Sequence, residues 1–318
     1  LTDIPGLLVG HASDFDGLTG CTVILCGERG AVCGVDIRGS ASGTQETPTL
    51  AADHITDRIH ALLLTGGSAY GLEAASGVRA WLESKGRGFD MRVARVPIVP
   101  AAVIFDLHIG KASARPDKGM GLAAAAAATN GAVAEGNVGA GTGATVGKIL
   151  GIGHAMKGGV GTATVALSGP MQGVLVSALV VVNAVGAVRD PASGRILAGA
   201  RQAPDSREFL NTAEARKRGV NWQVPTGSNT TLVAVATNAK LSKVGCTKVA
   251  QLSHAGLTRA IWPAHTTMDG DTAFCISLGE RSADVNAIGI AAAEATEQAI
   301  LRAVRAAETL GGVPGLKR

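Results

Sequence analysis

Short runs of β-branched and aliphatic residues recur along the chain at the length of β-strands. Stretches with apolar residues at helical spacing alternate with these runs. The runs that predict strands are Cys21–Cys26, Ala31–Ile37, Ala61–Leu64, Thr162–Leu167, Val174–Val182, Leu232–Thr237 and Ala273–Leu278.

Four stretches predict helices. Ser68–Ser84 has helical spacing and is followed by Gly86, while Leu122–Ala128 is rich in alanine. Ser242–Ala260 and Asp284–Thr309 are the longest. This mixture of elements indicates an α/β or α+β protein in which helices cover sheets.

Two segments stand out from the alternating pattern. Gly136–Arg189 contains no Asp or Glu, is dense in glycine, and holds only two lysines, Lys148 and Lys157. In such a stretch, backbone N–H groups and any cationic side chain dominate the local electrostatic potential. Asp190–Gly227 is rich in Pro, Gly and charged residues around a short helical piece, Arg207–Arg218, and predicts an exposed connection.

Composition narrows the possible functions. Of the 318 residues, 46% are hydrophobic but only 3% are aromatic, and 44 are glycine. The core must therefore consist of closely packed aliphatic residues. An aromatic-rich binding module is excluded, and we expect no stacking of bases on aromatic rings. Charged residues make up 17%, with a net charge of +4 and no Lys/Arg run, so we expect no nucleic-acid partner. The low charge favours a homo-oligomer with buried subunit contacts.

The five cysteines contain no C-x-x-C motif, which predicts reduced thiols packed in the core of a cytoplasmic protein. Leu1–Gly10 lacks the basic and apolar regions of an export signal. The most apolar stretch, Val174–Val188, has only the length of a strand or core helix and contains Asn183, so no membrane span is expected.

Motifs for cofactors and metals are weak. The glycine-rich segment Gly139–Lys148 has Thr142 and Ile149 where a phosphate-binding loop needs Gly and Ser/Thr. We therefore expect no cofactor. His265 precedes the acidic pair of Asp269-Gly270-Asp271, which leaves a metal site as an alternative, but a turn leading into the next strand is the simpler interpretation, and no metal is expected.

Asn229-Thr230-Thr231 lies where the exposed connection meets a predicted strand, and three interpretations compete. It is formally a glycosylation sequon, it is an ordinary strand start, or it is an autocatalytic cleavage site. In the third case the Thr230 hydroxyl attacks the preceding carbonyl, and hydrolysis of the resulting ester frees Thr230 as a new N-terminus. The hydroxyl is then the nucleophile and the α-amine a nearby base, with a pKa of about 7.7–8.0.

Motifs that extend over nearly the whole chain resemble the DmpA-type peptidase family, which includes β-aminopeptidases, D/L-aminopeptidases and nylon-oligomer hydrolases. Eleven blocks occur in family order, and together they favour the cleavage interpretation. They are Ile4–Gly6, Val9–His11, Gly20–Ile24, Gly34–Gly39, Leu64–Leu72, Pro97–Asp106, Arg115–Lys118, Gly136–Gly141, Asn229–Thr231, Ala236–Ala239 and His265–Thr272.

The resemblance implies an α+β fold, a four-layer αββα sandwich of the DmpA and ornithine acetyltransferase type. It implies a single domain over residues 1–318, cut between Asn229 and Thr230 into chains 1–229 and 230–318. The two chains would stay together in one sheet core, and these pairs would assemble into tetramers or larger oligomers.

The resemblance also assigns roles to residues. Thr230 matches the nucleophile. Lys148 matches a lysine beside it, whose charge would keep the new α-amine unprotonated. Asn183 matches an amide that could donate to the oxyanion, and Tyr70 matches an aromatic pocket position that could donate a second hydrogen bond. The ordinary alternatives are a surface cation for Lys148, a turn cap for Asn183 and a core position for Tyr70.

Asp269 and Asp271 match an acidic pair of the nylon-hydrolase branch, which would orient the Thr230 amine or hold a substrate ammonium group. For Asp271 the alternative is a cap for a strand or turn. Together the residues predict a self-processing threonine hydrolase of small amides, whether short peptides, β-peptides or nylon-like oligomers. Acyl transfer of the ornithine acetyltransferase kind and an uncleaved binding protein stay open as alternatives.

Overall fold

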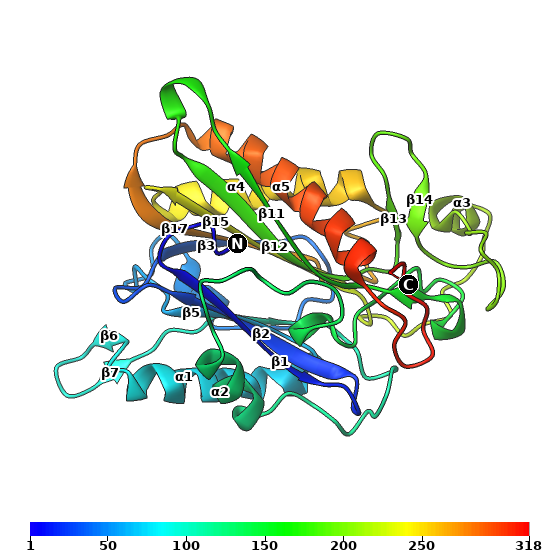
Figure 1. Cartoon of the computed structure of the whole chain (residues 1–318), viewed down its shortest axis with the longest axis horizontal. Coiled ribbons are helices and arrows are strands. Elements are labelled where there is room, and N and C mark those ends of the chain that lie inside the picture. Colours follow the sequence, from blue (N-terminus) through cyan, green and yellow to red (C-terminus); the bar gives the residue numbers. More distant parts are fainter. Residues whose placement is uncertain (318) are drawn as a thin grey trace.

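The structure is a computed structural model that describes residues 1–317. Two five-stranded sheets lie face to face, and each is covered on its outer side by a pair of helices (Figure 1). The first sheet has the order β11-β12-β15-β17-β3, in which only the pair β15–β17 is parallel. Its strands are β11 (Gly159–Ala166), β12 (Leu175–Asn183), β15 (Thr230–Ala239), β17 (Thr272–Arg281) and β3 (Val32–Ile37).

The second sheet has the order β1-β2-β5-β8-β4 and pairs antiparallel except between β5 and β8. Its strands are β1 (Leu7–Asp14), β2 (Thr19–Cys26), β5 (Ala61–Thr65), β8 (Ala101–Val103) and β4 (Thr44–Gln45). All seven runs expected to be strands lie on strands of these two sheets, with shifts of a few residues at their ends.

Helices α4 (Lys243–Ala260) and α5 (Val285–Ala306) cover the first sheet, and α1 (Ala74–Ser84) and α2 (Lys118–Ala126) cover the second (Figure 1). The four expected helices are thereby confirmed, with one difference. The first part of Ser68–Ser84 is a 3-10 helix, Ser68–Glu73, rather than α-helix. The layer order is therefore αββα, as the resemblance implied.

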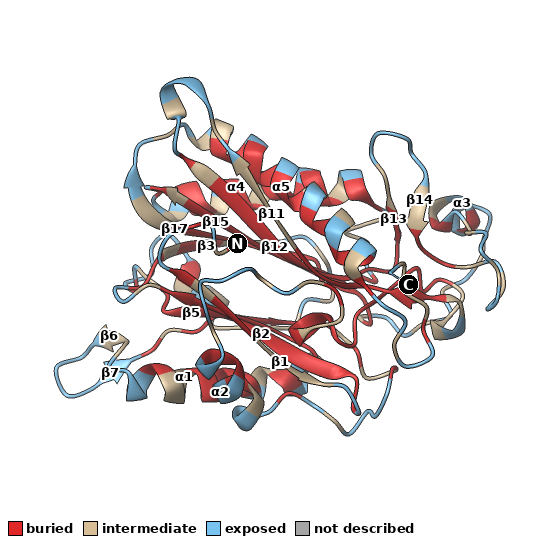
Figure 2. Cartoon of the chain, in the orientation of Figure 1, coloured by how far each residue is buried: buried red, intermediate tan, exposed pale blue. Residues whose placement is uncertain are grey.

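Three apolar cores separate the layers, and the buried residues follow both sheets (Figure 2). The middle core joins side chains of the two sheets, such as Ile24 and Leu64 on one and Leu232 and Phe274 on the other. Small residues where the helices meet let them approach closely. A Cβ on Gly256 of α4 would lie 1.9 Å from the carbonyl oxygen of Ala293 in α5, so this helix contact requires glycine.

Smaller elements gather at one end of the sandwich (Figure 1). They include a three-stranded sheet of β14 (Ile196–Ala198), β13 (Ala187–Arg189) and β16 (Ile261–Trp262), and a pair formed by β9 (Thr145–Val146) and β10 (Met156–Lys157). The expected connection Asp190–Gly227 carries β14 and the helix α3 (Thr212–Lys217), which is shorter than the expected Arg207–Arg218. A two-stranded ribbon, β6 (Phe89–Asp90) and β7 (Arg95–Val96), lies beyond α1.

No helix within residues 1–317 is both long enough and apolar enough to cross a membrane.

Candidate active site at the start of β15

Thr230 is the first residue of β15, in the middle of the first sheet. It pairs with Asn183, the last residue of β12, and only 3% of its surface is exposed. Its hydroxyl Oγ1 lies 2.6 Å from the carbonyl oxygen of Asn229 and donates a hydrogen bond to it. The nucleophile expected from the sequence therefore lies directly beside the peptide group that it would cut.

The Asn229 carbonyl oxygen has a second donor. The backbone N–H of Gly270 donates to it at 2.8 Å, within a bridge that pairs Asn229 with Asp269. Asn229 is completely buried, and its side-chain nitrogen donates to the carbonyl oxygen of Met268 at 3.2 Å. The peptide bond before Thr230 is thus fixed in place and shielded from water.

Asp271 holds the first turn of β15 in position. Its Oδ1 accepts a hydrogen bond from the Thr231 N–H at 2.7 Å, and its Oδ2 accepts from the His265 N–H at 3.0 Å and lies 2.9 Å from His265 Nδ1. Since its own oxygens are engaged in this way, Asp271 positions the strand that carries Thr230.

Replacing Asp271 by alanine is expected to lower the free energy of unfolding by about 1–3 kcal/mol, because the buried Thr231 N–H loses its acceptor. Asp271→Asn, which keeps an oxygen for Thr231, should cost less. Urea denaturation of both variants in a chain that cannot be cut tests this, and equal stability of Asp271→Ala and the parent chain would contradict it.

Asp269 lies beside Asp271 and is also buried. Its Oδ2 accepts hydrogen bonds from the N–H and the hydroxyl of Thr266, at 3.1 and 2.6 Å. Burial, followed by the negative charge of Asp271, raises the pKa of the Asp269 carboxyl. The acidic pair expected from the sequence is brought together beside Thr230, and Asp269 is protonated more easily than an ordinary carboxylate.

Lys148 is completely buried, so the alternative of a surface cation is wrong. Its Nζ donates to Thr145 O at 2.9 Å, to Asn183 O at 2.9 Å and to Asn183 Oδ1 at 2.8 Å. Burial holds the pKa of Lys148 well below its ordinary value, against the opposing effect of Asp269. The three donated hydrogen bonds match the ammonium form, whereas burial favours the neutral amine, and the expected action of Lys148 through its charge stays a prediction.

Asn183 connects this lysine to the nucleophile's strand. Its Oδ1 also accepts from the Thr145 N–H at 3.0 Å, and its Nδ2 donates to the carbonyl oxygen of Phe105 at 3.1 Å. The amide expected to serve the oxyanion is thus partly engaged elsewhere in the uncut chain, where Gly270 contacts the carbonyl before Thr230.

Tyr70 is 59% exposed on the 3-10 helix after β5, so the alternative of a core position is wrong. The guanidinium of Arg115 lies 3.6 Å from the centre of its ring. Within residues 1–317, no hydrogen bond joins Tyr70 to Thr230, Asn183 or Lys148. Its expected role as an oxyanion donor stays a prediction.

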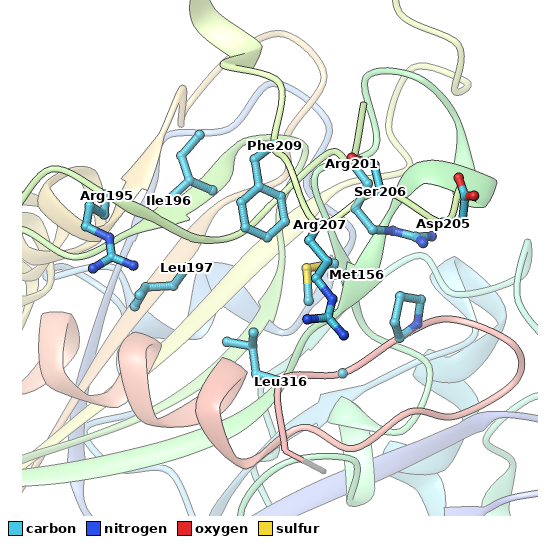
Figure 3. A pocket seen from close by; sticks show the side chains of 12 residues that line it. Met156, Arg195, Ile196, Leu197, Arg201, Asp205, Ser206, Arg207, Phe209 and Leu316 are labelled. Atoms are coloured by element: carbon cyan, nitrogen blue, oxygen red, sulfur yellow. The ribbon is translucent and has the colours of Figure 1, made fainter. Parts of the chain in front are cut away.

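A groove on the surface lies away from these residues. It has a volume of about 540 Å³ and lies between the segment 195–209 and the C-terminal segment 314–316 (Figure 3). Its lining combines arginines, among them Arg195 and Arg207, with apolar side chains such as Phe209 and Leu316. None of the site residues expected from the sequence lines it. Thr230 itself is 3% exposed and is therefore shielded from solvent in the single chain.

Sequence reasoning noticed the Asp-Gly-Asp motif but missed the contribution of Gly270, which acts through its backbone and gives no side-chain signal. It also missed His265 as a partner of Asp271. Among residues 1–317, no group of three or more His, Cys, Asp or Glu is placed to hold a metal ion.

Comparisons with known proteins identify the family of the chain. The model of peptidase family S58 matches residues 1–318. An uncharacterized aminopeptidase of Mycobacterium tuberculosis is 40% identical, over 99% of this chain and 96% of that protein. A 6-aminohexanoate-oligomer endohydrolase of a Kocuria species is 33% identical, over 95% of this chain and 85% of that protein.

Solved structures share the fold. The L-aminopeptidase D-Ala-esterase/amidase of Ochrobactrum anthropi, described as a variant of the Ntn-hydrolase fold, superimposes with a TM-score of 0.75 at 19% identity, over 98% of this chain and 87% of that one. A β-aminopeptidase of a Burkholderia species gives a TM-score of 0.69 at 24% identity, over 99% and 90%. The chain belongs to peptidase family S58 and is a hydrolase that acts on amide or peptide bonds.

Proposed function

We propose that the chain cuts itself between Asn229 and Thr230 and that the freed Thr230 is the nucleophile of the mature enzyme. The observation that carries this proposal is the convergence of two groups on one buried carbonyl. The Thr230 hydroxyl and the Gly270 N–H both contact the Asn229 oxygen, at 2.6 and 2.8 Å. Residues 1–229 and 230–318 would then be the two chains of the mature protein.

Self-cleavage proceeds in two steps. The Thr230 Oγ1 attacks the carbonyl carbon of Asn229, its proton passes to a base, and the C–N bond to Thr230 breaks as the nitrogen takes up a proton. The product is an ester between Asn229 and the Thr230 hydroxyl, with a free α-amine. Water then adds to the ester carbonyl, leaving a carboxylate on Asn229 and restoring the hydroxyl.

In the mature enzyme the same hydroxyl attacks the amide carbonyl of a substrate. The α-amine of Thr230, with an ordinary pKa of about 7.7–8.0, takes the hydroxyl proton and passes it to the leaving amine. Water then hydrolyses the acyl-enzyme ester. Asp269 and Asp271, which are buried in the segment just before β17, orient the new ammonium or receive that of the substrate.

Lys148 is the base that we assign to the first cut, when no free α-amine exists. Its Nζ bonds the main-chain oxygen of Asn183, the residue that pairs with Thr230 across the sheet. The lowered pKa of Lys148 supports this role, because a neutral amine donates only two of the three hydrogen bonds of Nζ and keeps a lone pair that can accept a proton.

For the substrate we propose a small amide or short peptide with a free amino end. Relatives called aminopeptidases support this choice. Linear 6-aminohexanoate oligomers are the second candidate, favoured by the relatives named as endohydrolases of those oligomers. Both substrates present an amide carbonyl with an ammonium group that the acidic pair can bind.

Intact-mass spectrometry and a substrate panel test the proposed function together. Purified protein should show two masses, those of 1–229 and 230–318, and should hydrolyse either aminoacyl p-nitroanilides or 6-aminohexanoate oligomers. A single unbroken chain after long incubation, without hydrolysis, would favour a binding protein. If ornithine or glutamate becomes acylated in the presence of an acyl donor, the chain is an acyltransferase.

We further propose that the mature pairs form a homo-oligomer in the cytoplasm. Several large apolar side chains are exposed on the single chain, including Val93, Ile55 and Ile290, and all five cysteines are buried as free thiols. Light scattering of the purified protein tests the first part, since a single pair at micromolar concentration would contradict it.

A further inference from the structure

We propose that the backbone N–H of Gly270 is the oxyanion donor of this enzyme, used first when the chain cuts itself and again when substrate is hydrolysed. The inference rests on the proposed function and deepens it, because it assigns a catalytic group that no side-chain motif reveals. The carbonyl oxygen of Asn229 receives the Gly270 N–H at 2.8 Å, beside the attacking Oγ1 of Thr230.

The distance suits stabilisation of a developing charge. When Oγ1 adds to the carbonyl carbon of Asn229, that carbon becomes tetrahedral and its oxygen takes a full negative charge. A donor already within 2.7–3.1 Å of that oxygen stabilises the charge without reorganisation. Asn229 is completely buried and Thr230 is 3% exposed, so water does not replace this hydrogen bond.

The segment that carries the donor is rigidly held from both sides. Before Gly270, the Asp269 carboxyl binds Thr266, and the Asp269 carbonyl accepts from the Ala41 N–H at 2.9 Å. After it, the Asp271 carboxyl binds Thr231 and His265. The acidic pair thus positions the N–H between them, in addition to any direct role with an ammonium group.

The residue at this position has to be glycine for reasons of space. A Cβ on residue 270 would lie 2.7 Å from Thr230 Oγ1 and 2.6 Å from the carbonyl oxygen of Ala41. Both distances are well below van der Waals contact. Any side chain would therefore displace the nucleophile or the donor, whereas glycine lets the backbone approach the reacting group directly.

The role of the Gly270 N–H in substrate hydrolysis follows from the products of self-cleavage. Hydrolysis turns the Asn229 carbonyl into a carboxylate in a buried place next to Asp269 and Asp271. Burial of a new negative charge beside two acidic side chains is unfavourable, so the carboxylate is expected to leave this place. The Gly270 N–H is then free to receive the carbonyl oxygen of a substrate, which is attacked by the same Thr230 Oγ1.

A backbone ester at position 270 tests the inference directly. Nonsense suppression with glycolic acid replaces the Gly270 N–H by an oxygen and adds no bulk. We expect self-cleavage, followed by intact mass, to slow by about 100- to 1000-fold, the usual effect of removing one oxyanion donor. The matched control is the same ester at Gly312, which is exposed, has open space around it, and donates no hydrogen bond to a residue within 1–317.

The outcomes separate the inference from the proposed function. If the unmodified chain does not cut itself, the proposed function fails. If it does and the Gly270 ester cuts within about threefold of the Gly312 ester, only the assignment of Gly270 is overturned. After long incubation the cut ester variant should show a kcat reduced by about 100-fold or more with little change in KM, again on the scale of one lost donor. A normal kcat would overturn the second use of the donor.

A spectroscopic measurement keeps the test independent of turnover. In a Thr230→Val chain with ¹³C at the Asn229 carbonyl, the ester at Gly270 should shift the carbonyl stretch to higher frequency, because the polarising N–H is gone. The Gly312 ester should leave the band in place. Identical spectra for the two esters would contradict the contact, and thermal melting of both variants shows whether each is folded.

Discussion

Thr230→Val is expected to leave the chain in one piece and to abolish hydrolysis. Valine has nearly the shape of threonine, so the change removes the hydroxyl while β15 keeps its packing. Without Oγ1 neither the ester with Asn229 nor an acyl-enzyme can form. Intact mass should show one species over days, and activity on any substrate of the wild-type panel should fall to the uncatalysed background.

Two further variants make this result specific. Thr230→Ser keeps a hydroxyl and should cut itself, at an altered rate. Thr296→Val removes a hydroxyl that is equally buried, within α5, and that has no hydrogen-bond partner among residues 1–317. It should cut and hydrolyse like wild type. Normal processing of Thr230→Val would contradict the assignment of the nucleophile.

Lys148→Met should slow self-cleavage by about 100- to 10,000-fold, the contribution typical of a positioned general base. Methionine fills most of the lysine's volume but accepts no proton. In the wild-type chain the rate should rise with pH through the lowered pKa of Lys148, because only the neutral amine is a base. Below that pKa the rate should fall about tenfold for each unit of pH, as the protonated fraction grows.

Lys157 supplies a matched control for Lys148. It is 1% exposed, its Nζ donates to Thr142 O at 2.7 Å, and burial lowers its pKa to about 7. It has no hydrogen bond to Asn183 in the described structure. Lys157→Met keeps the proposed base, so cleavage should persist, with its pH profile moved to higher pH because the charge of Lys157 helps to lower the pKa of Lys148. If the two variants slow cleavage equally, Lys148 acts through packing and is not the base.

The sequence predicts the layers of the fold better than it predicts the ends and types of individual strands and helices. β12 and β15 are apolar on both faces because sheets and helices cover them, so their composition alone predicts strands. β1 was missed because it is half-buried and interrupted by Gly10 and His11. The start of Ser68–Ser84 is a tight 3-10 helix because Gly71 lies against the Gly66 carbonyl, a close approach that helical periodicity does not reveal.

At the candidate site, the sequence predicts which residues are present but not their charge or their exposure to solvent. Thr230, Asn183, Lys148 and the acidic pair could be named from motifs. Whether Lys148 carries a charge depends on its complete burial, which arises only when β12 and the segment after β9 come together. The exposure of Tyr70 likewise depends on the packing of a short helix against Arg115 and not on residue type.

The proposed place of the cut within the sheet would have a consequence for how the mature protein stays assembled. β15 lies between β12, which belongs to residues 1–229, and β17, which pairs in turn with β3 of that same part. Residues 230–318 therefore supply two inner strands of a sheet whose other strands belong to residues 1–229, so neither part completes the sheet alone. Folding as one chain makes this assembly unimolecular, and the cut then removes the tether. The mature enzyme would stay assembled once folded but would refold slowly from denaturant. Refolding would then require two separate chains to meet, so its rate would fall on dilution.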